Sequence, residues 1–265
     1  DSYPGDRAVV GETALLFTEQ VASYYGRGDE LHMSFNFPPL FAPWQAAAWR
    51  ERIDVTHAEL DPRDAWPTWV LSNHDQPRHR TRHGSEARAR AAAVLLLALR
   101  GTPFLYMGEE LGLENAVIPE DRVVDPGGRD GCRAPVPWNA EAGHGWPGEP
   151  WLPWPPEAGP RSAETQRADL GSILHLYRRL LAIRRASPAL RLGSFAWRDA
   201  PEGVLCWERQ HAGDRRVVAV NFEEKPVELS LRGLHRVALA SDGTGEGDSF
   251  EGTLASEQAV VLTPE

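Results

Sequence analysis

The most informative stretch of this 265-residue chain is Trp69-Val70-Leu71-Ser72-Asn73-His74-Asp75-Gln76-Pro77-Arg78. Its first three residues continue an apolar run from Ala65 and predict a short buried strand. An amide, an imidazole and a carboxylate then follow one another at the carboxyl end of that strand. In an arbitrary sequence, Asn, Ser and Asp more often cap a helix or close a turn. The neighbouring segments therefore decide whether this triad is structural or functional.

Three other segments accompany this stretch in a fixed order. Upstream, Ala8-Val9-Val10-Gly11-Glu12-Thr13 is an apolar run that ends in a glutamate, and downstream lie the segments 99–112 and 128–138. Together the four segments resemble signature regions of the α-amylase family, glycoside hydrolase family 13. The resemblance is to its α-glucosidase and oligo-1,6-glucosidase branch, and it spans most of residues 1–190.

The resemblance implies a retaining glycoside hydrolase, in which one carboxylate is the nucleophile and a second carboxyl group acts as acid and then as base. Glu12 matches the acid/base position, whose pKa must be raised for the first step. Asp75 matches the third carboxylate of the family, which binds sugar hydroxyls most tightly in the transition state. By the same resemblance, His74 donates a hydrogen bond to that sugar. Adjacent strand residues face opposite ways, so His74 and Asp75 can both face sugar only where the strand already turns into its loop.

Several further residues are expected to surround these groups. The resemblance assigns Arg129 and Arg133 to a wall of the sugar pocket, where a guanidinium group can donate to hydroxyls or orient a carboxylate. The alternative for both is a surface ion pair. Asn73 is expected to support the site, and Arg78 is expected to be a partner of its carboxylates. The acidic pair Glu109-Glu110 follows the last predicted strand, and we expect it to cap the next helix.

Residues 119–160 are dense in Gly, Pro and Trp and predict a long loop. Its aromatic side chains can stack on sugar faces, but they more often pack the loop itself. The tryptophans concerned are Trp138, Trp146, Trp151 and Trp154.

One family signature is missing from the chain. The Arg-x-Asp that supplies the nucleophile belongs on the fourth barrel strand, which should precede Gly11, and only ten residues do so. The segment 52–55 has the same pattern but follows a helical run between two later strands, so we interpret it as coincidence. We therefore expect the carboxyl-terminal part of a longer enzyme, which alone is inactive. Its required partner is the amino-terminal half of the barrel, on the same or a separate chain.

The predicted elements alternate as a barrel requires. Strands are predicted at residues 8–10, 31–37, 69–71 and 104–107, and helices at residues 15–25, 44–53, 86–100 and 170–181. Short strands separated by turn residues follow from about residue 195 and are typical of a small antiparallel domain. The expected fold class is α/β followed by all-β. Residues 1–190 would form the carboxyl-terminal half of a (β/α)8 TIM barrel (strands 5–8), and residues 191–265 an antiparallel β-sandwich domain.

Composition excludes some classes of function. The hydrophobic fraction of 42% suffices for a sizeable core, and no apolar run has transmembrane length. The net charge of -10 argues against a nucleic-acid partner. Cys132 and Cys206 make neither a disulfide framework nor a metal cluster, and His79 and His83 lack further zinc ligands nearby. We expect no cofactor, no metal and no membrane partner, and a cytoplasmic location.

The expected substrate is an α-glucoside or short oligosaccharide, cleaved by an α-glucosidase. An α-glucosyl-transferring or isomerising relative, of the trehalose synthase or sucrose isomerase type, has the same motifs and stays open. So does a non-catalytic interaction protein of the same family. Such proteins have lost catalytic residues, whereas Glu12, His74 and Asp75 are all present here, which favours the enzyme.

Overall fold

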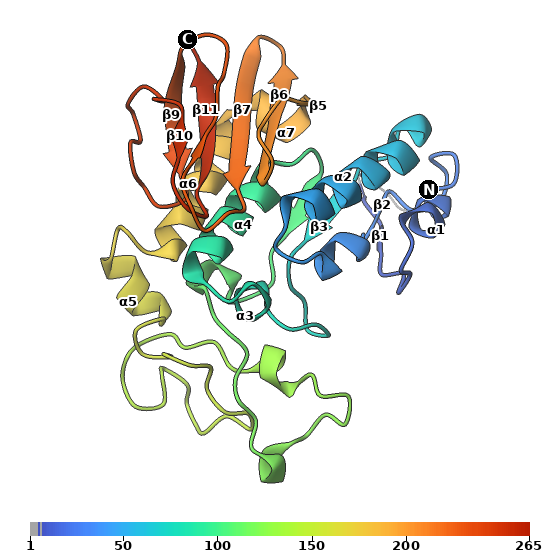
Figure 1. The fold of residues 1–265 in the computed structure, drawn as a ribbon. Helices are drawn as coiled ribbons and strands as arrows, with labels where there is room; N and C mark the ends of the chain where they lie inside the picture. The colour runs from blue at the N-terminus through green and yellow to red at the C-terminus, as the bar shows by residue number, and fades with distance from the viewer. Residues whose placement is uncertain (1–4, 6) are drawn as a thin grey trace.

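The computed structural model describes Gly5 and residues 7–265, and the chain begins with four short strands (Figure 1). They are β1 (Val10–Gly11), β2 (Met33–Ser34), β3 (Thr68–Val70) and β4 (Thr102–Phe104). β1 pairs in parallel with β2, and β3 pairs in parallel with β4. The Thr68 hydroxyl joins the two pairs, because it donates to the carbonyl of Ser34 (2.7 Å) and accepts from the amide of Asn36 (3.1 Å).

Helices connect these parallel strands, as strands running in one direction require. They are α1 (Thr18–Ser23), α2 (Ala46–Leu60), α3 (His79–His83) and α4 (Glu86–Ala98). α4 is buried along most of its length and is apolar on every side after Arg90, as expected of a central helix. The Ser85 hydroxyl caps it by accepting from the amide of Arg88 (3.1 Å). This helix is the centre of the largest core.

A long irregular segment follows β4 and forms the lower part of the molecule in Figure 1. It contains three single 3-10 turns, at Glu109–Leu111, Glu120–Arg122 and Asp130–Arg133. Three helices then lead to the last sheet: α5 (Ala163–Ala168), α6 (Ile173–Ala186) and α7 (Pro188–Leu192). The apolar face of α6 packs on α4, which brings the end of the chain back to the strands.

The carboxyl-terminal region is rich in antiparallel sheet. Five strands lie in the order β5-β6-β7-β11-β9: β5 (Ser194–Trp197), β6 (Val204–His211), β7 (Asp214–Asn221), β9 (His235–Ala240) and β11 (Ala259–Pro264). The short antiparallel pair β8 (Val227–Glu228) and β10 (Thr253–Leu254) packs on one face of this sheet. The other face packs on α4 and α6, and the core continues across that contact. Arg209 on β6 is buried there and donates to the carbonyl of Ala98 at the end of α4 (2.8 Å).

Some predicted element bounds were wrong. The predicted helix 44–53 continues to Leu60, and the predicted strand 31–37 is only Met33–Ser34. The last predicted strand, 104–107, lies at Thr102–Phe104 because the amide of Thr102 donates to the carbonyl of Pro67 (2.8 Å) and fixes the register with β3. No helix in the described part of the chain has the length and apolar character needed to cross a membrane.

Candidate active site

The site begins where β3 ends. Residues 71–77 form neither helix nor strand, and the Asn73 carboxamide oxygen accepts from the amides of Asp75 (3.0 Å) and Gln76 (2.8 Å). This side chain closes a tight turn directly after the strand. The alternation of strand side chains no longer applies there, and Nε2 of His74 lies 3.5 Å from Oδ1 of Asp75. The two adjacent residues therefore face the same site, which the sequence allowed only if the strand had already ended.

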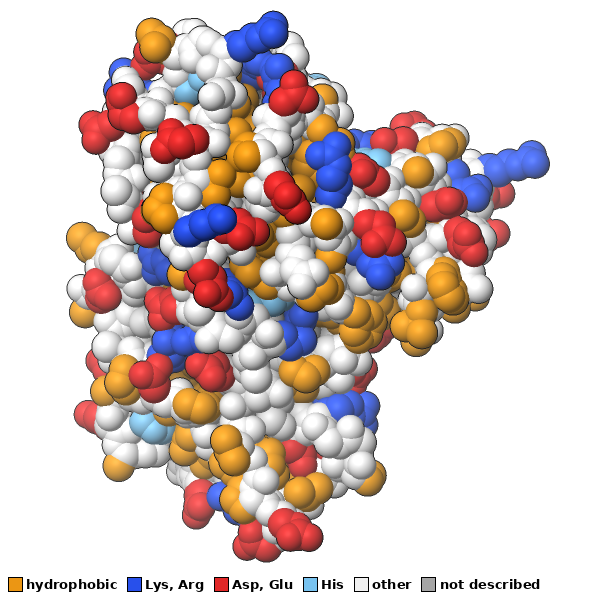
Figure 2. Space-filling view, viewed as in Figure 1, with side chains coloured by type: hydrophobic (Ala, Val, Ile, Leu, Met, Phe, Trp, Pro, Cys, Tyr) orange, Lys and Arg blue, Asp and Glu red, His pale blue; other side chains and the backbone are white. Residues whose placement is uncertain are grey.

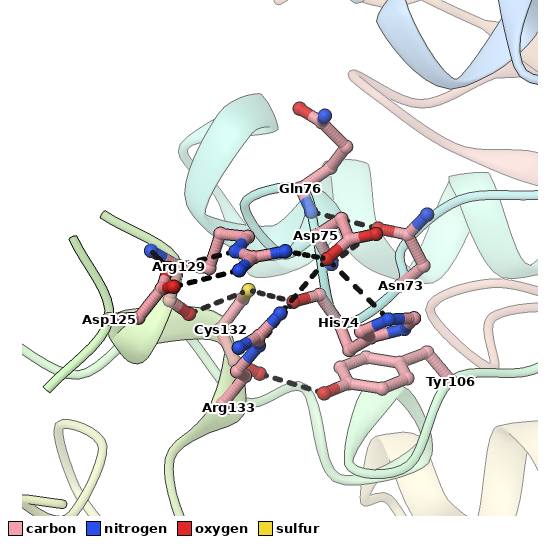
Figure 3. A network of polar contacts seen from close by, with 9 residues as sticks. All are labelled: Asn73, His74, Asp75, Gln76, Tyr106, Asp125, Arg129, Cys132 and Arg133. Carbon is pink, nitrogen blue, oxygen red and sulfur yellow. Dashed lines mark hydrogen bonds and ion pairs between the residues drawn. The ribbon is translucent and has the colours of Figure 1, made fainter. Parts of the chain in front are cut away.

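Two guanidinium groups hold the carboxylate of Asp75 (Figure 3). Arg129 Nη1 donates to Oδ1 of Asp75 at 2.9 Å, and Arg133 Nη2 donates to the same oxygen at 3.0 Å. Partial burial on its own would raise the pKa of Asp75. The hydrogen bonds from Arg129 and Arg133 and the proximity of His74 outweigh that effect, so the pKa is lowered. Asp75 is thus kept as an anion with its carboxylate fixed in direction.

Asp125 fixes Arg129 from the opposite side. Its two oxygens accept from Nη2 (2.7 Å) and Nε (2.8 Å) of Arg129, a bidentate arrangement. These bonds hold the pKa of the Asp125 carboxyl well below its usual range and raise that of Arg129. From the sequence, a surface ion pair was the expected alternative for Arg129, and Asp125 was not identified as its partner, although the spacing of four residues was a usable signal.

The segment that carries these arginines is anchored to the turn at His74. Arg133 Nε donates to the carbonyl of His74 at 2.8 Å, and the Cys132 thiol donates to the same carbonyl at 3.3 Å. The Tyr106 hydroxyl donates to the carbonyl of Cys132 at 3.0 Å. Cys132 and Tyr106 were not among the predicted site residues. Their contacts, drawn in Figure 3, connect the segment after β4, the turn at His74 and the loop at Arg133.

Glu12 follows β1 directly and lines the same cleft as Asp75. The cleft has a volume of about 180 Å³, and apolar side chains such as Phe37 and Leu15 form its other walls. One carboxylate oxygen of Glu12, one of Asp75 and a ring nitrogen of His74 lie within 4.8 Å of one another. Three such atoms are close enough to share a cation. Two guanidinium groups already donate to Oδ1 of Asp75, however, and they would compete with a cation for that oxygen.

Arg78 lies in a different place from the one expected. It is buried, donates through Nη1 to the carbonyl of Met107 (2.6 Å), and lies over the ring of Tyr106 at 4.8 Å. Its own amide donates to the side chain of Asn115 (2.8 Å). Arg78 therefore connects the turn after Asp75 to the segment after β4, through its amide and its guanidinium group. It does not pair with Asp75 or Glu12.

A buried polar cluster lies behind the turn. His79 Nδ1 lies 3.0 Å from the Ser72 hydroxyl and 3.5 Å from Oε1 of Glu109, whose side chain is only 1% exposed. The expected capping role is met by Glu110 alone, which accepts from the amide of Gly108 at 2.9 Å. Burial raises the pKa of Glu110. Glu109 instead faces the interior, because the 3-10 turn at Glu109–Leu111 packs against α6.

The tryptophans of the long loop have structural contacts. Trp146 donates through Nε1 to the carbonyl of Val136 (2.8 Å), and its ring meets that of Trp154 edge to face at 6.1 Å. Trp138 and Trp151 are exposed. None of the four lines the cleft of Glu12 and Asp75.

Comparison with known proteins agrees with the family resemblance seen in the sequence. The family model described as "Alpha amylase, catalytic domain" matches residues 1–193. A probable α-glucosidase of Rhizobium meliloti is 33% identical over 248 residues, which cover 87% of this chain and 45% of that protein. An oligo-1,6-glucosidase of Parageobacillus thermoglucosidasius is 26% identical, covering 83% of this chain and 47% of that protein.

Solved structures of TIM-barrel enzymes in this family match the whole described chain, including its sheet-rich carboxyl-terminal region. The α-glucosyl transfer enzyme XgtA is 33% identical with a TM-score of 0.85, covering 100% of this chain and 52% of that chain. The trehalulose synthase MutB of Pseudomonas mesoacidophila MX-45 is 27% identical with a TM-score of 0.85, covering 98% and 56%. The chain thus spans about half the length of the proteins it matches. On the match over residues 1–193, it belongs to the α-amylase family.

Proposed function

We propose that this chain supplies the carboxyl-terminal half of the catalytic barrel of a retaining α-glucosidase that acts on short α-glucosides. One observation carries the proposal: Glu12 and Asp75 follow the ends of two strands and line one cleft. In this proposal Glu12 is the acid/base and Asp75 stabilises the transition state, with the nucleophilic aspartate supplied by the other half of the barrel. Localisation in the cytoplasm remains a prediction.

The geometry supports these two roles. Asp75 is held as an anion by Arg129 and Arg133, so it can accept hydrogen bonds from sugar hydroxyls but has no proton to give. Glu12 makes no ion pair with another described residue, so its carboxyl group is free to exchange a proton with a leaving oxygen. A ligand that fills the cleft would desolvate Glu12 beside Asp75.

The amino-terminal half of the barrel is the partner that the exposed surfaces favour. β1 and β4 each have one described neighbour, and each leaves an edge unpaired. Large apolar side chains are exposed next to both edges, Leu16 and Phe17 after β1 and Leu105 and Met107 after β4. Figure 2 shows hydrophobic side chains gathered along the lower edge of the arm that contains β1 and α1. Four further strands would cover these edges, and we place the domain boundary at 190/191, before the β-sandwich.

Transfer of glucose is the second candidate function. It is favoured by the similarity to XgtA and to MutB, whose names state glucosyl transfer and trehalulose synthesis. Hydrolysis and transfer share the first chemical step and differ in whether water or a hydroxyl group attacks the intermediate. A non-catalytic role is the weaker alternative. It gives no reason why Arg129 and Arg133 both donate to Asp75, or why Asp125 fixes Arg129.

The test compares Glu12→Gln and Asp75→Asn in an active protein, meaning this chain together with a polypeptide that supplies the first four strands. Glu12→Gln should abolish cleavage of substrates with poor leaving groups but slow an activated aryl α-glucoside less, because that oxygen departs without a proton. Azide should restore turnover of the activated substrate, since an anionic nucleophile needs no general base. Asp75→Asn should slow both substrates alike and should not respond to azide.

The matched control is Glu19→Gln, an exposed glutamate on α1 that lies outside the cleft and should keep full activity. Residues 1–265 alone should leave the aryl α-glucoside intact. Indistinguishable profiles for the two variants would refute the assignment of Glu12, and turnover by the chain alone would refute the need for a partner. Products formed with an added sugar acceptor would separate transfer from hydrolysis.

A further inference from the structure

A second, larger cleft lies in the carboxyl-terminal sheet. Its volume is about 560 Å³, within the range of small-molecule sites, and none of its lining residues is shared with the cleft of Glu12 and Asp75. Arg215 and Val217 lie on the same face of β7, and Val217 belongs to the core beneath β8 and β10. The cleft is therefore on that face, where the loop from Ser230 to Arg232 lies over the sheet.

The floor of this cleft is built from two arginines that share one carboxylate. Glu208 on β6 accepts from Arg215 Nε at 2.6 Å and from both Nε and Nη2 of Arg198, just after β5. Burial on its own would raise the pKa of Glu208, but these hydrogen bonds outweigh it and lower that pKa. The Glu208 side chain is 13% exposed, whereas those of Arg198 and Arg215 are 41% and 40% exposed. One carboxylate thus orients two accessible guanidinium groups and leaves one positive charge in excess.

The opposite wall adds further donors. Among the described residues, the guanidinium group of Arg232 and the hydroxyl of Ser230 have no hydrogen-bond or ion-pair partner. His235 is buried at the start of β9, where its Nδ1 donates to the carbonyl of Gly233 (3.2 Å), so this N–H is not available to a ligand. Within the described part of the chain, Asp199 is the one acidic residue that lines the cleft. Cationic and neutral donors therefore outnumber acceptors in a chain whose net charge is -10.

We infer that this cleft binds the phosphate group of a small phosphorylated molecule. Guanidinium groups match phosphate oxygens in pairs, and the ones here are oriented by Glu208 before any ligand arrives. With Asp199 and Glu208 counted, the three arginines leave one positive charge in the cleft, which attracts a phosphate monoester of nearly two negative charges at neutral pH. Asp199 can accept hydrogen bonds from hydroxyl groups, which favours a sugar phosphate over free phosphate.

The experiment is calorimetric titration of residues 1–265 with inorganic phosphate, glucose 6-phosphate and glucose at constant ionic strength. Both phosphates should bind and glucose should not. Arg232→Gln removes a side chain without partners, so the fold should be unaffected, and it should weaken phosphate binding by about tenfold or more. Arg191→Gln is the matched control, because it removes the same charge from an exposed position on α7 outside the cleft.

Tighter binding of glucose 6-phosphate than of phosphate identifies the ligand as a sugar ester, and equal binding identifies it as free phosphate. Absence of phosphate binding would overturn the inference. So would equal weakening by Arg191→Gln, which would indicate a diffuse charge effect, or equal binding of glucose. Arg215→Gln provides a second measurement: it should weaken binding as well, with retention of the sheet verified by circular dichroism.

Discussion

His83 should make the stability of this protein depend on pH. The side chain ends α3, is 3% exposed, and lies with its ring 5.1 Å from that of Trp44. Burial lowers its pKa to about 2, and His79, Arg82 and Arg88 add to the effect because each disfavours a further positive charge. Its Nε2 has no hydrogen-bond partner among the described residues that would compensate protonation. His83 is therefore neutral in the folded protein at any ordinary pH.

The size of the effect follows from linkage. In the unfolded chain the imidazole has a pKa of about 6.5, so below that pH the unfolded state binds a proton that the folded state excludes. The unfolded state then binds more protons, and stability falls by about 1.4 kcal/mol for each pH unit below 6.5. Between pH 7 and pH 5 the loss is about 2 kcal/mol, and it stops only as the pH nears the folded pKa of about 2.

Urea unfolding at pH 7 and pH 5, followed by circular dichroism, measures this loss. The wild-type chain should lose about 2 kcal/mol more over this interval than His83→Phe, which packs a similar ring and cannot take up a proton. His83→Asn serves as a second variant in case the phenyl ring packs poorly against Trp44. Other titrating groups are common to all three proteins and cancel in the difference. Equal losses in wild type and both variants would mean that His83 is protonated in the folded state, and the reasoning would fail.

Much of the fold could be predicted from the sequence, because its signals are local. The apolar run before Asn73, the alanine- and leucine-rich helix at residues 86–100 and the short strands after residue 194 are each present in the structure. Bounds were less predictable where tertiary contacts set them. β4 begins at Thr102 because its amide pairs with Pro67, and α2 continues past Ile53 because its later residues Thr56 and Leu60 are buried. The partner of the Thr102 amide lies outside the segment, whereas the helical spacing of Ile53, Thr56 and Leu60 was a usable signal for the length of α2.

The candidate site also contains residues that the sequence could indicate and contacts that it could not. Glu12, His74 and Asp75 were predicted because they end strands in segments that resemble the family, and Arg129 and Arg133 because they lie in a further such segment. The contacts from Tyr106 to Cys132 and from Cys132 to His74 cross 26 and 58 residues of chain, so spacing alone could not reveal them. Burial is equally invisible: Glu109 has the sequence of a helix cap, and only packing shows that it faces inward.

Substitutions at Ser187 and at Gly101 give two further tests by urea unfolding. Ser187→Ala should cost about 1–2 kcal/mol, because the buried hydroxyl accepts from the amide of Leu190 and donates to Asp214. Gly101→Ala should cost more than about 2 kcal/mol, since φ is +139° and a Cβ there would lie 2.7 Å from the carbonyl oxygen of Pro67 and 2.6 Å from Nε1 of Trp69. The carbonyl cannot move without breaking the bond from Thr102 that fixes β4 on β3. Gly128→Ala is the control, because its φ is also positive but a Cβ there meets nothing within 4 Å, so only backbone strain of about 1 kcal/mol remains. If Gly101→Ala and Gly128→Ala lower the free energy of unfolding by the same amount, steric contact at Gly101 contributes nothing and the register of β4 must be set elsewhere.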